Sequence, residues 1–167
     1  MSVRIRPAAG TETDVRFLQE MLYLAATWRP DRPHRSRAEL LSDPKIAVYL
    51  AGWPRAADAG VLAEDTLGAP LGAAWYRLFD EVEPGYGFID TSIPELTVGV
   101  RPEARGRGVG TALLRELIQR ARLERLPALS LSVEEDNPAV RLYERLGFVP
   151  VGRDDKAWTM RLDLDTA

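Results

Sequence analysis

The stretch RPEARGRGVGTALL, residues 101–114, is the part of the chain that most limits its fold. Its three glycines stand at every second position, after a run of alternating apolar residues and before a helical stripe. A helix start presents unpaired N–H groups and a partial positive charge, and glycines let an anion approach the backbone closely. Arg105 and Arg107 add full positive charges. The segment therefore predicts a strand-to-helix turn that binds a phosphate-bearing ligand.

Two common nucleotide-binding loops do not fit this turn. A nucleoside triphosphate loop requires the pattern G-x-x-x-x-G-K-[ST], and no lysine follows Gly110. The dinucleotide pattern G-x-G-x-x-G requires a glycine where Thr111 stands, and no ribose-binding acid ends the next predicted strand before Glu134. The pattern that is present is R-x-x-G-x-G, which begins at Arg105. A dinucleotide site remains an alternative at this stage.

A βαβ unit surrounds the turn. Residues 94–100 alternate, with Leu96, Val98 and Val100 on one face of a strand and Glu95, Thr97 and Gly99 on the other. Residues 113–121 carry a helical stripe, and residues 129–133 alternate again. A strand, a helix and a strand over this length predict two parallel strands joined by a right-handed crossover.

The next helix has sequence signals for both its start and its end. Asn137 stands at the N-cap, Pro138 at the first helical position and Gly147 just past the end. The apolar stripe of this helix includes Tyr143, so the tyrosine should face inward. Residues 148–152 and 157–162 predict two closing strands around a polar turn.

The first half of the chain is less regular. We expect strands over residues 3–7, 60–65 and 71–79, helices over 14–26 and 37–42, and loops over 28–36 and 80–90. Thr13 or Asp14 is the expected N-cap of the first helix. Residues 46–53 fit a helix and a strand equally.

Composition excludes several classes of protein. A chain of 167 residues with 46% hydrophobic content has the size of a single domain, residues 1–167. A net charge of -3 argues against nucleic-acid binding. With no cysteine, disulfides, thiolate zinc sites and cysteine nucleophiles are excluded, and we expect no metal. Neither a signal peptide nor an apolar run of roughly 18–20 residues is present, so we expect a cytoplasmic protein without membrane contact.

The glycine pattern, placed after a strand, resembles the coenzyme A pyrophosphate loop of the GNAT family of N-acetyltransferases. The later segment NPAVRLYERLGF independently resembles the helix of that family that faces the cofactor. The resemblance covers about residues 94–151. It implies an α/β fold with a mixed, mostly antiparallel twisted sheet, one parallel strand pair and flanking helices. It also implies direct transfer of an acetyl group from acetyl-CoA to a primary amine.

The same resemblance implies site residues. The cofactor-binding set is Val98, Val100, Arg105, Gly106, Arg107, Gly108, Val109, Gly110, Thr111 and Asn137. A bulge near residues 98–100 would free main-chain groups to polarise the thioester carbonyl, although Gly99 is equally explained as room for a packed neighbour. Tyr143 would protonate the departing thiolate, unless it is a core aromatic that only happens to carry a hydroxyl; because it lies on the buried stripe, its hydroxyl should find a partner there. Glu95 would accept the amine proton, directly or through a water, unless it is an ordinary solvated carboxylate.

The acceptor is less constrained than the donor. We expect the amine of a small molecule or a peptide, in a site bounded by the first two helices. Four acids would favour a cationic amine through their negative field, unless they form only a solvated loop: Asp80, Glu81, Glu83 and Asp90. His34 is expected to be an ordinary surface residue. A noncatalytic acyl-CoA binding or sensing domain remains the alternative function, and the C-terminal edge strands leave a homodimer open.

Overall fold

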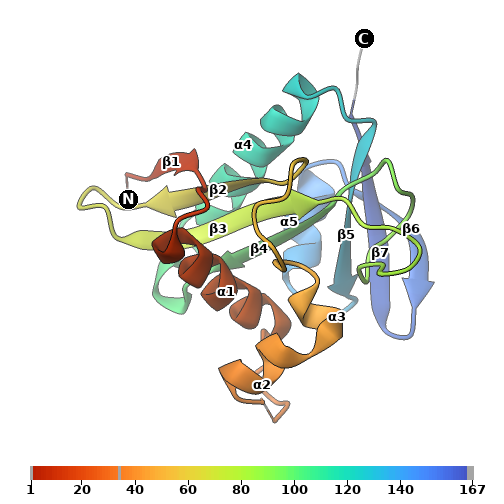
Figure 1. The fold of residues 1–167 in the computed structure, drawn as a ribbon, viewed down its shortest axis with the longest axis horizontal. Coiled ribbons are helices and arrows are strands. Elements are labelled where there is room, and N and C mark those ends of the chain that lie inside the picture. Colours follow the sequence, from red (N-terminus) through yellow and green to blue (C-terminus); the bar gives the residue numbers. More distant parts are fainter. Residues whose placement is uncertain (1, 34, 165–167) are drawn as a thin grey trace.

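In the computed structural model, which describes residues 2–33 and 35–164, one seven-stranded mixed sheet forms the centre of the molecule (Figure 1). The strands, in their spatial order, are β1 (Arg4–Pro7), β2 (Ala59–Glu64), β3 (Pro70–Arg77), β4 (Glu95–Val100), β5 (Ala128–Glu134), β7 (Ala157–Asp163) and β6 (Val149–Asp154). The pair formed by β4 and β5 is parallel, and the other neighbouring strands are antiparallel. The predicted mixed sheet with one parallel pair is confirmed. His34 lies outside the described residues.

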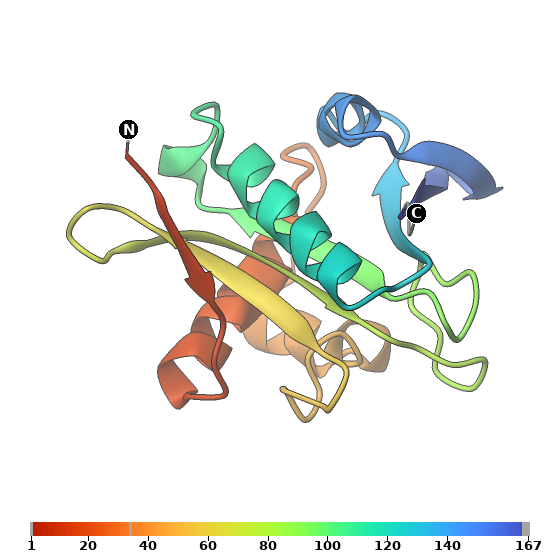
Figure 2. The same ribbon diagram turned by 90° about the horizontal axis from the view of Figure 1, so that it is seen from above.

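Helices cover both faces of the sheet (Figure 2). One face carries α1 (Glu12–Ala26), α2 (Arg37–Ser42) and α3 (Pro44–Ala47), and the other carries α4 (Val109–Leu123) and α5 (Ala139–Arg145). A 3₁₀ turn, Pro102–Ala104, precedes the glycine turn. No helix within the described residues is both long enough and apolar enough to cross a membrane.

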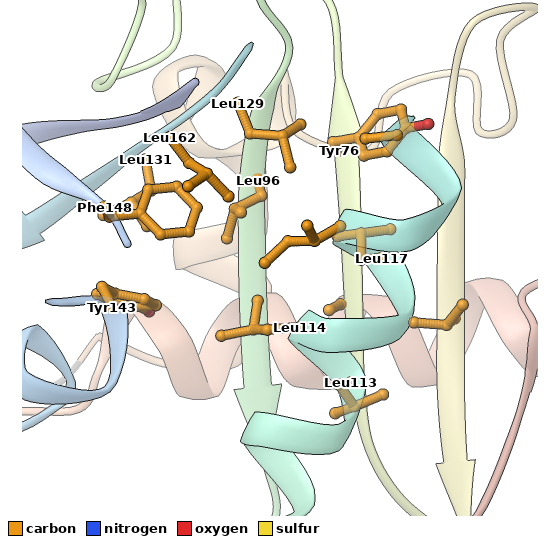
Figure 3. Packing of buried hydrophobic residues seen from close by; sticks show 14 of the residues in the cluster. Tyr76, Leu96, Leu113, Leu114, Leu117, Leu129, Leu131, Tyr143, Phe148 and Leu162 are labelled. Carbon is orange, nitrogen blue, oxygen red and sulfur yellow. The ribbon is translucent and has the colours of Figure 1, made fainter. Parts of the chain in front are cut away.

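The larger of two hydrophobic clusters lies between the sheet and α4 with α5. The leucines of the predicted stripe, Leu113, Leu114 and Leu117, are fully buried against the sheet (Figure 3). Tyr143 and Phe148 extend this cluster beyond β5. The second cluster lies beneath α1 on the opposite face. Burial of each leucine stabilises the fold by about 2 kcal/mol.

The ambiguous segment 46–53 does not form a strand. Its first two residues end α3 at Ala47, and turns follow. The predicted N-cap of α1 is wrong, because Thr11 occupies that position and accepts the N–H of Asp14 at 3.3 Å. Asp14 cannot cap the helix, since its carboxylate is bound by Arg6 at 2.8 and 2.9 Å. At α5 the predicted capping bond is confirmed, with Asn137 Oδ1 accepting the N–H of Ala139 at 2.9 Å, but the helix begins one residue later than predicted.

The bulge expected in β4 is absent from the pairing of β4 with β3. The register is unbroken from Glu95, opposite Arg77, to Val100, opposite Gly72. Gly99 instead admits α1, because a Cβ at this position would lie 2.6 Å from the carbonyl oxygen of Met21. On its other edge β4 pairs with β5 only at Glu95 and Ser130. The two parallel strands therefore diverge beyond this point, and their divergence, not a bulge, leaves the main chain of β4 accessible.

Candidate active site

A cleft of about 890 Å³ opens where β4 and β5 diverge. Seven of the predicted site residues line it: Glu95, Val98, Val100, Arg105, Gly110, Asn137 and Tyr143. The other five lie in the glycine turn and the first turn of α4, outside the cleft lining: Gly106, Arg107, Gly108, Val109 and Thr111. The whole lining comes from segments near the start, in the middle and near the end of the chain, so residues far apart in the sequence meet at one cleft.

The glycine turn has the geometry of an anion site. Gly106 and Gly108 have φ of +74° and +81°, values that other residues rarely adopt. A Cβ at either glycine would meet no atom within 4 Å, so the backbone conformation and not a lack of space requires glycine. Among the residues that the structure describes, no side chain caps α4, and the N–H groups at its start have no partner within the helix. The turn and its arginines fit a pyrophosphate group.

Glu95 is buried at the narrow end of the cleft. Only 3% of its surface is exposed, which rules out the solvated strand-end carboxylate. Its Oε1 accepts the N–H of Gly87 at 2.9 Å, and its Oε2 accepts the hydroxyl of Tyr49. Burial raises the pKa of Glu95 to about 7, and these two hydrogen bonds oppose the rise. A carboxylate with this pKa can accept a proton near neutral pH.

The loop over Glu95 depends on two glycines. A Cβ at Gly85 would clash with Glu95 Oε1, and a Cβ at Gly87 would lie 2.6 Å from the carbonyl carbon of Leu131 in β5. The segment Gly85–Gly87 therefore closes over the carboxylate in a way that larger residues would prevent. The glycines of this loop were visible in the sequence, but nothing in their spacing connected them with Glu95.

Tyr49 is the functional residue that the sequence did not indicate. It lines the cleft, is 6% exposed and comes from the turns that follow α3. Besides donating to Glu95, its hydroxyl accepts the N–H of Tyr86 at 2.8 Å. Tyr49 lies in the segment whose secondary structure was ambiguous, and its partner Glu95 is 46 positions away.

Tyr143 lies on α5 at the opposite wall of the cleft. It faces inward as predicted, is 8% exposed, and meets the ring of Phe148 edge-on at 6.0 Å. Within the part of the chain that the structure describes, its hydroxyl has no hydrogen-bond partner, so the partner expected inside the fold is not there. Burial raises the pKa of Tyr143 to about 12. The hydroxyl therefore keeps its proton at neutral pH and remains free to donate it to a group in the cleft.

The loop after α1 closes the far end of the cleft. Glu134, at the end of β5, accepts hydrogen bonds from Trp28 at 3.3 Å, Arg29 at 3.1 Å and Arg32 at 3.3 Å. Arg35 also lines the cleft and pairs with Asp43 at 3.1 Å. At this end of the cleft, the arginines are therefore paired with carboxylates.

The four acids of residues 80–90 are not among the described residues that line the cleft, so their expected negative field would act on an acceptor only from outside that lining. Asp80 accepts the N–H groups of Val82 and Glu83 at 2.9 and 2.8 Å, and Asp90 accepts from Ser92. These carboxylates stabilise turns of their own loop. The sequence showed the charge of these acids but not which way their side chains point.

The model of the "Acetyltransferase (GNAT) family" matches residues 20–148, more than half of the chain. A mycothiol acetyltransferase of Arthrobacter sp. (strain FB24) is 42% identical over 89 residues, which are 53% of this chain and 26% of that protein. An L-methionine sulfoximine/L-methionine sulfone acetyltransferase of Pseudomonas paraeruginosa (strain DSM 24068 / PA7) is 38% identical over 89 residues, 53% of this chain and 49% of that protein. The chain thus spans about a quarter and a half of these two relatives.

Among solved structures, the fold is similar to that of a GNAT superfamily phosphinothricin acetyltransferase from Sinorhizobium meliloti in complex with acetyl-CoA. The TM-score is 0.66 at 24% identity, and the match covers 98% of this chain and 89% of that one. This likeness concerns the fold: the same arrangement of sheet and helices recurs over nearly the whole length of both chains.

Proposed function

Because this chain belongs to the acetyltransferase (GNAT) family, we propose that it transfers the acetyl group of acetyl-CoA to the primary amine of a small molecule or peptide. The single observation that carries this proposal is the presence of two proton-transfer groups in one cleft beside an anion-binding turn. Glu95 has a pKa near 7, and Tyr143 has a pKa near 12. A domain that only binds acyl-CoA has no use for either group.

Acetyl-CoA supplies the activated acetyl group in this proposal, and the chain supplies its binding and the proton transfers. The N–H groups of Gly108 to Thr111, with Arg105 and Arg107 nearby, hold the pyrophosphate. Arg105 is already anchored to β4, because its Nε donates to the carbonyl oxygen of Val100 at 3.0 Å. Asn137, just before α5, lines the same cleft as Tyr143. The cofactor thus lies along the divergence of β4 and β5.

The reaction breaks the C–S bond of the thioester and forms a C–N bond. The amine loses one proton, which Glu95 accepts, and the departing sulfur gains one, which Tyr143 donates. Main-chain groups of Val98 and Val100, on the strand that borders the cleft, polarise the carbonyl. Before the reaction, Glu95 is ionised and can accept the amine proton, and Tyr143 is protonated and can donate one.

The acceptor in this proposal is a small amine with an apolar body. Along the side formed by α1 to α3 and the turns that follow, the cleft is lined by Leu22, Trp28, Leu40, Ile46 and Tyr49, and Arg32 and Arg35 also line it. The relatives named for mycothiol and for L-methionine sulfoximine or L-methionine sulfone are both named for small molecules, which supports a small acceptor. We propose no nucleic-acid partner.

The test is release of the free thiol of CoA from acetyl-CoA in the presence of a panel of small amines that includes L-methionine sulfone. At least one amine should support turnover, and Tyr143→Phe should lower kcat by 10²-fold or more while acetyl-CoA still raises the unfolding temperature. Stabilisation by acetyl-CoA without turnover of any amine would favour the noncatalytic binding domain. Stabilisation by NAD instead of acetyl-CoA would contradict both functions.

A further inference from the structure

We infer that Tyr49 and Asp58 are positioning residues for Glu95: Tyr49 fixes the orientation of the carboxylate, and Asp58 keeps the neighbouring cation Arg77 away from it. This inference rests on the proposed role of Glu95 as the proton acceptor. Neither residue carried any signal in the sequence, and neither has to touch a substrate to act.

Tyr49 reaches Glu95 with a fixed geometry. Its hydroxyl donates to Oε2 while it accepts the N–H of Tyr86 at 2.8 Å, so the direction of its proton is set from both sides. Gly87 holds Oε1 at 2.9 Å. The carboxylate therefore meets two neutral donors, one at each oxygen, and cannot rotate without losing both.

The backbone around Tyr49 is held by β3. Arg77 Nη1 donates to the carbonyl oxygen of Val48 at 2.8 Å, and Trp75 Nε1 donates to that of Tyr49 at 3.2 Å. The ring of Tyr49 meets Phe79 edge-on at 5.1 Å. The position of the Tyr49 hydroxyl is thus fixed by the sheet, although Tyr49 itself lies in a turn.

Arg77 is the directly opposed neighbour of Glu95 in the pairing of β3 with β4. Residues opposed across antiparallel strands have Cβ atoms about 5 Å apart, within reach of an ion pair. Asp58 prevents that pair, because it holds Arg77 with two hydrogen bonds of 3.1 and 2.7 Å. The side chains of Arg77 and Asp58 are only 1% and 2% exposed, so water does not compete with this contact.

The consequence is chemical. The titratable groups of the described residues around Glu95 are Tyr49 and Tyr86 on the covering segments and Arg77 on β3, while β5 presents the hydroxyl of Ser130. A cation beside a carboxylate lowers its pKa, and a neutral donor does so less. With Arg77 bound to Asp58, burial dominates and the pKa of Glu95 stays near 7. A free Arg77 would hold Glu95 ionised and weakly basic.

The first test needs no acceptor. The midpoint of Glu95 titration is followed by carboxyl ¹³C NMR, with Glu95→Gln to assign the signal. Tyr49→Phe should raise this midpoint by about 1–2 pH units, because a hydrogen bond to a charged group stabilises the ionised form by roughly 1.5–3 kcal/mol and one pKa unit is about 1.4 kcal/mol. The matched control is Tyr76→Phe, since Tyr76 is a fully buried tyrosine that donates to a different carboxylate, Glu124, at 2.6 Å. The control should leave the Glu95 midpoint unchanged.

Asp58→Asn should shift the midpoint of Glu95 titration in the opposite direction. Without the negative charge of Asp58, the charge of Arg77 is no longer balanced and should lower the Glu95 midpoint, so the two positioning variants should move it in opposite directions. An unchanged midpoint in folded Tyr49→Phe would overturn the inference, whether or not Asp58→Asn folds. The kinetic counterpart is the acidic limb of kcat/KM, which should follow the NMR midpoint in each variant.

The two failures are distinguishable. If Glu95→Gln retained both turnover and the acidic limb, the proposed role of Glu95 would be wrong, even though Tyr49→Phe had moved its midpoint. If Glu95→Gln abolished turnover while Tyr49→Phe moved neither midpoint nor limb, the proposed function would stand and the positioning role of Tyr49 would be wrong.

Discussion

Replacing Glu95 with glutamine should change the pH dependence of stability, so that the variant gains on the wild type as the pH rises, although the residue lies in the proposed active site. The pKa of Glu95 is raised from 4.5 to about 7 by burial. A raised carboxyl pKa gives stability that is fully present below pH 4.5 and is lost as the pH rises through 7. The shift corresponds to about 3 kcal/mol of unfolding free energy, because one pKa unit is about 1.4 kcal/mol.

The assay is urea denaturation of the wild type and Glu95→Gln between pH 4.5 and 8.5, with the free energy of unfolding extrapolated to water. Glutamine fits the same space and does not ionise. The difference in unfolding free energy, variant minus wild type, should therefore rise by about 3 kcal/mol across this range. Because the other carboxylates are common to both proteins, their titration cancels in the difference.

The control is Glu124→Gln on the opposite face of the sheet. The hydrogen bonds from Tyr76 and Arg120 outweigh burial and hold the pKa of Glu124 below its usual value. Its contribution to stability is present above the unfolded pKa of 4.5 and is lost as the pH falls through the folded pKa, so the control variant should lose stability mainly at neutral and alkaline pH. A variant-minus-wild-type difference for Glu95→Gln that does not change with pH would refute the reasoning.

Three further predictions concern the fold and are checked by chemical denaturation. Gly99→Ala should cost about 1–3 kcal/mol, because the new methyl group would lie 2.6 Å from a backbone oxygen of α1. Arg77→Met should cost about 3–5 kcal/mol, since it leaves the Asp58 carboxylate buried without its partner. Gly108→Ala should cost about 1 kcal/mol because of its φ of +81°, whereas Gly110→Ala, in the first turn of a helix with ordinary contacts at 3.6 Å, should be neutral or stabilising.

The second half of the chain was predictable because its signals are local. Strand alternation, the helical stripe of α4 and the stops of α5 each lie within a few residues of the structure that they specify; the strands, the stripe and the end of α5 are confirmed, and α5 begins one residue later than predicted. Gly147 has the left-handed φ of +102° expected just past a helix. The same locality explains why the family resemblance was strongest in this half.

The centre of the candidate site was predictable only in part. Glu95 could be placed on a strand face by alternation, but its burial depends on the loop of Gly85 and on Tyr49, which no periodicity linked to it. The direction of an acidic loop, as at Asp80, is likewise set by turns and not by composition. Contacts between distant segments whose own patterns are weak leave no mark in a single sequence.

The single pairing of β4 with β5 has a mechanical consequence. β4 is paired along its other edge with β3, and β5 with β7, so a rotation of the two halves of the sheet about their one shared pair would displace residues more the farther they lie from this pivot. The pivot here is Glu95 with Ser130. Any widening of the cleft that admits a bulky molecule therefore moves the glycine turn and α5 most, while the carboxylate at the pivot stays nearly still relative to the sheet.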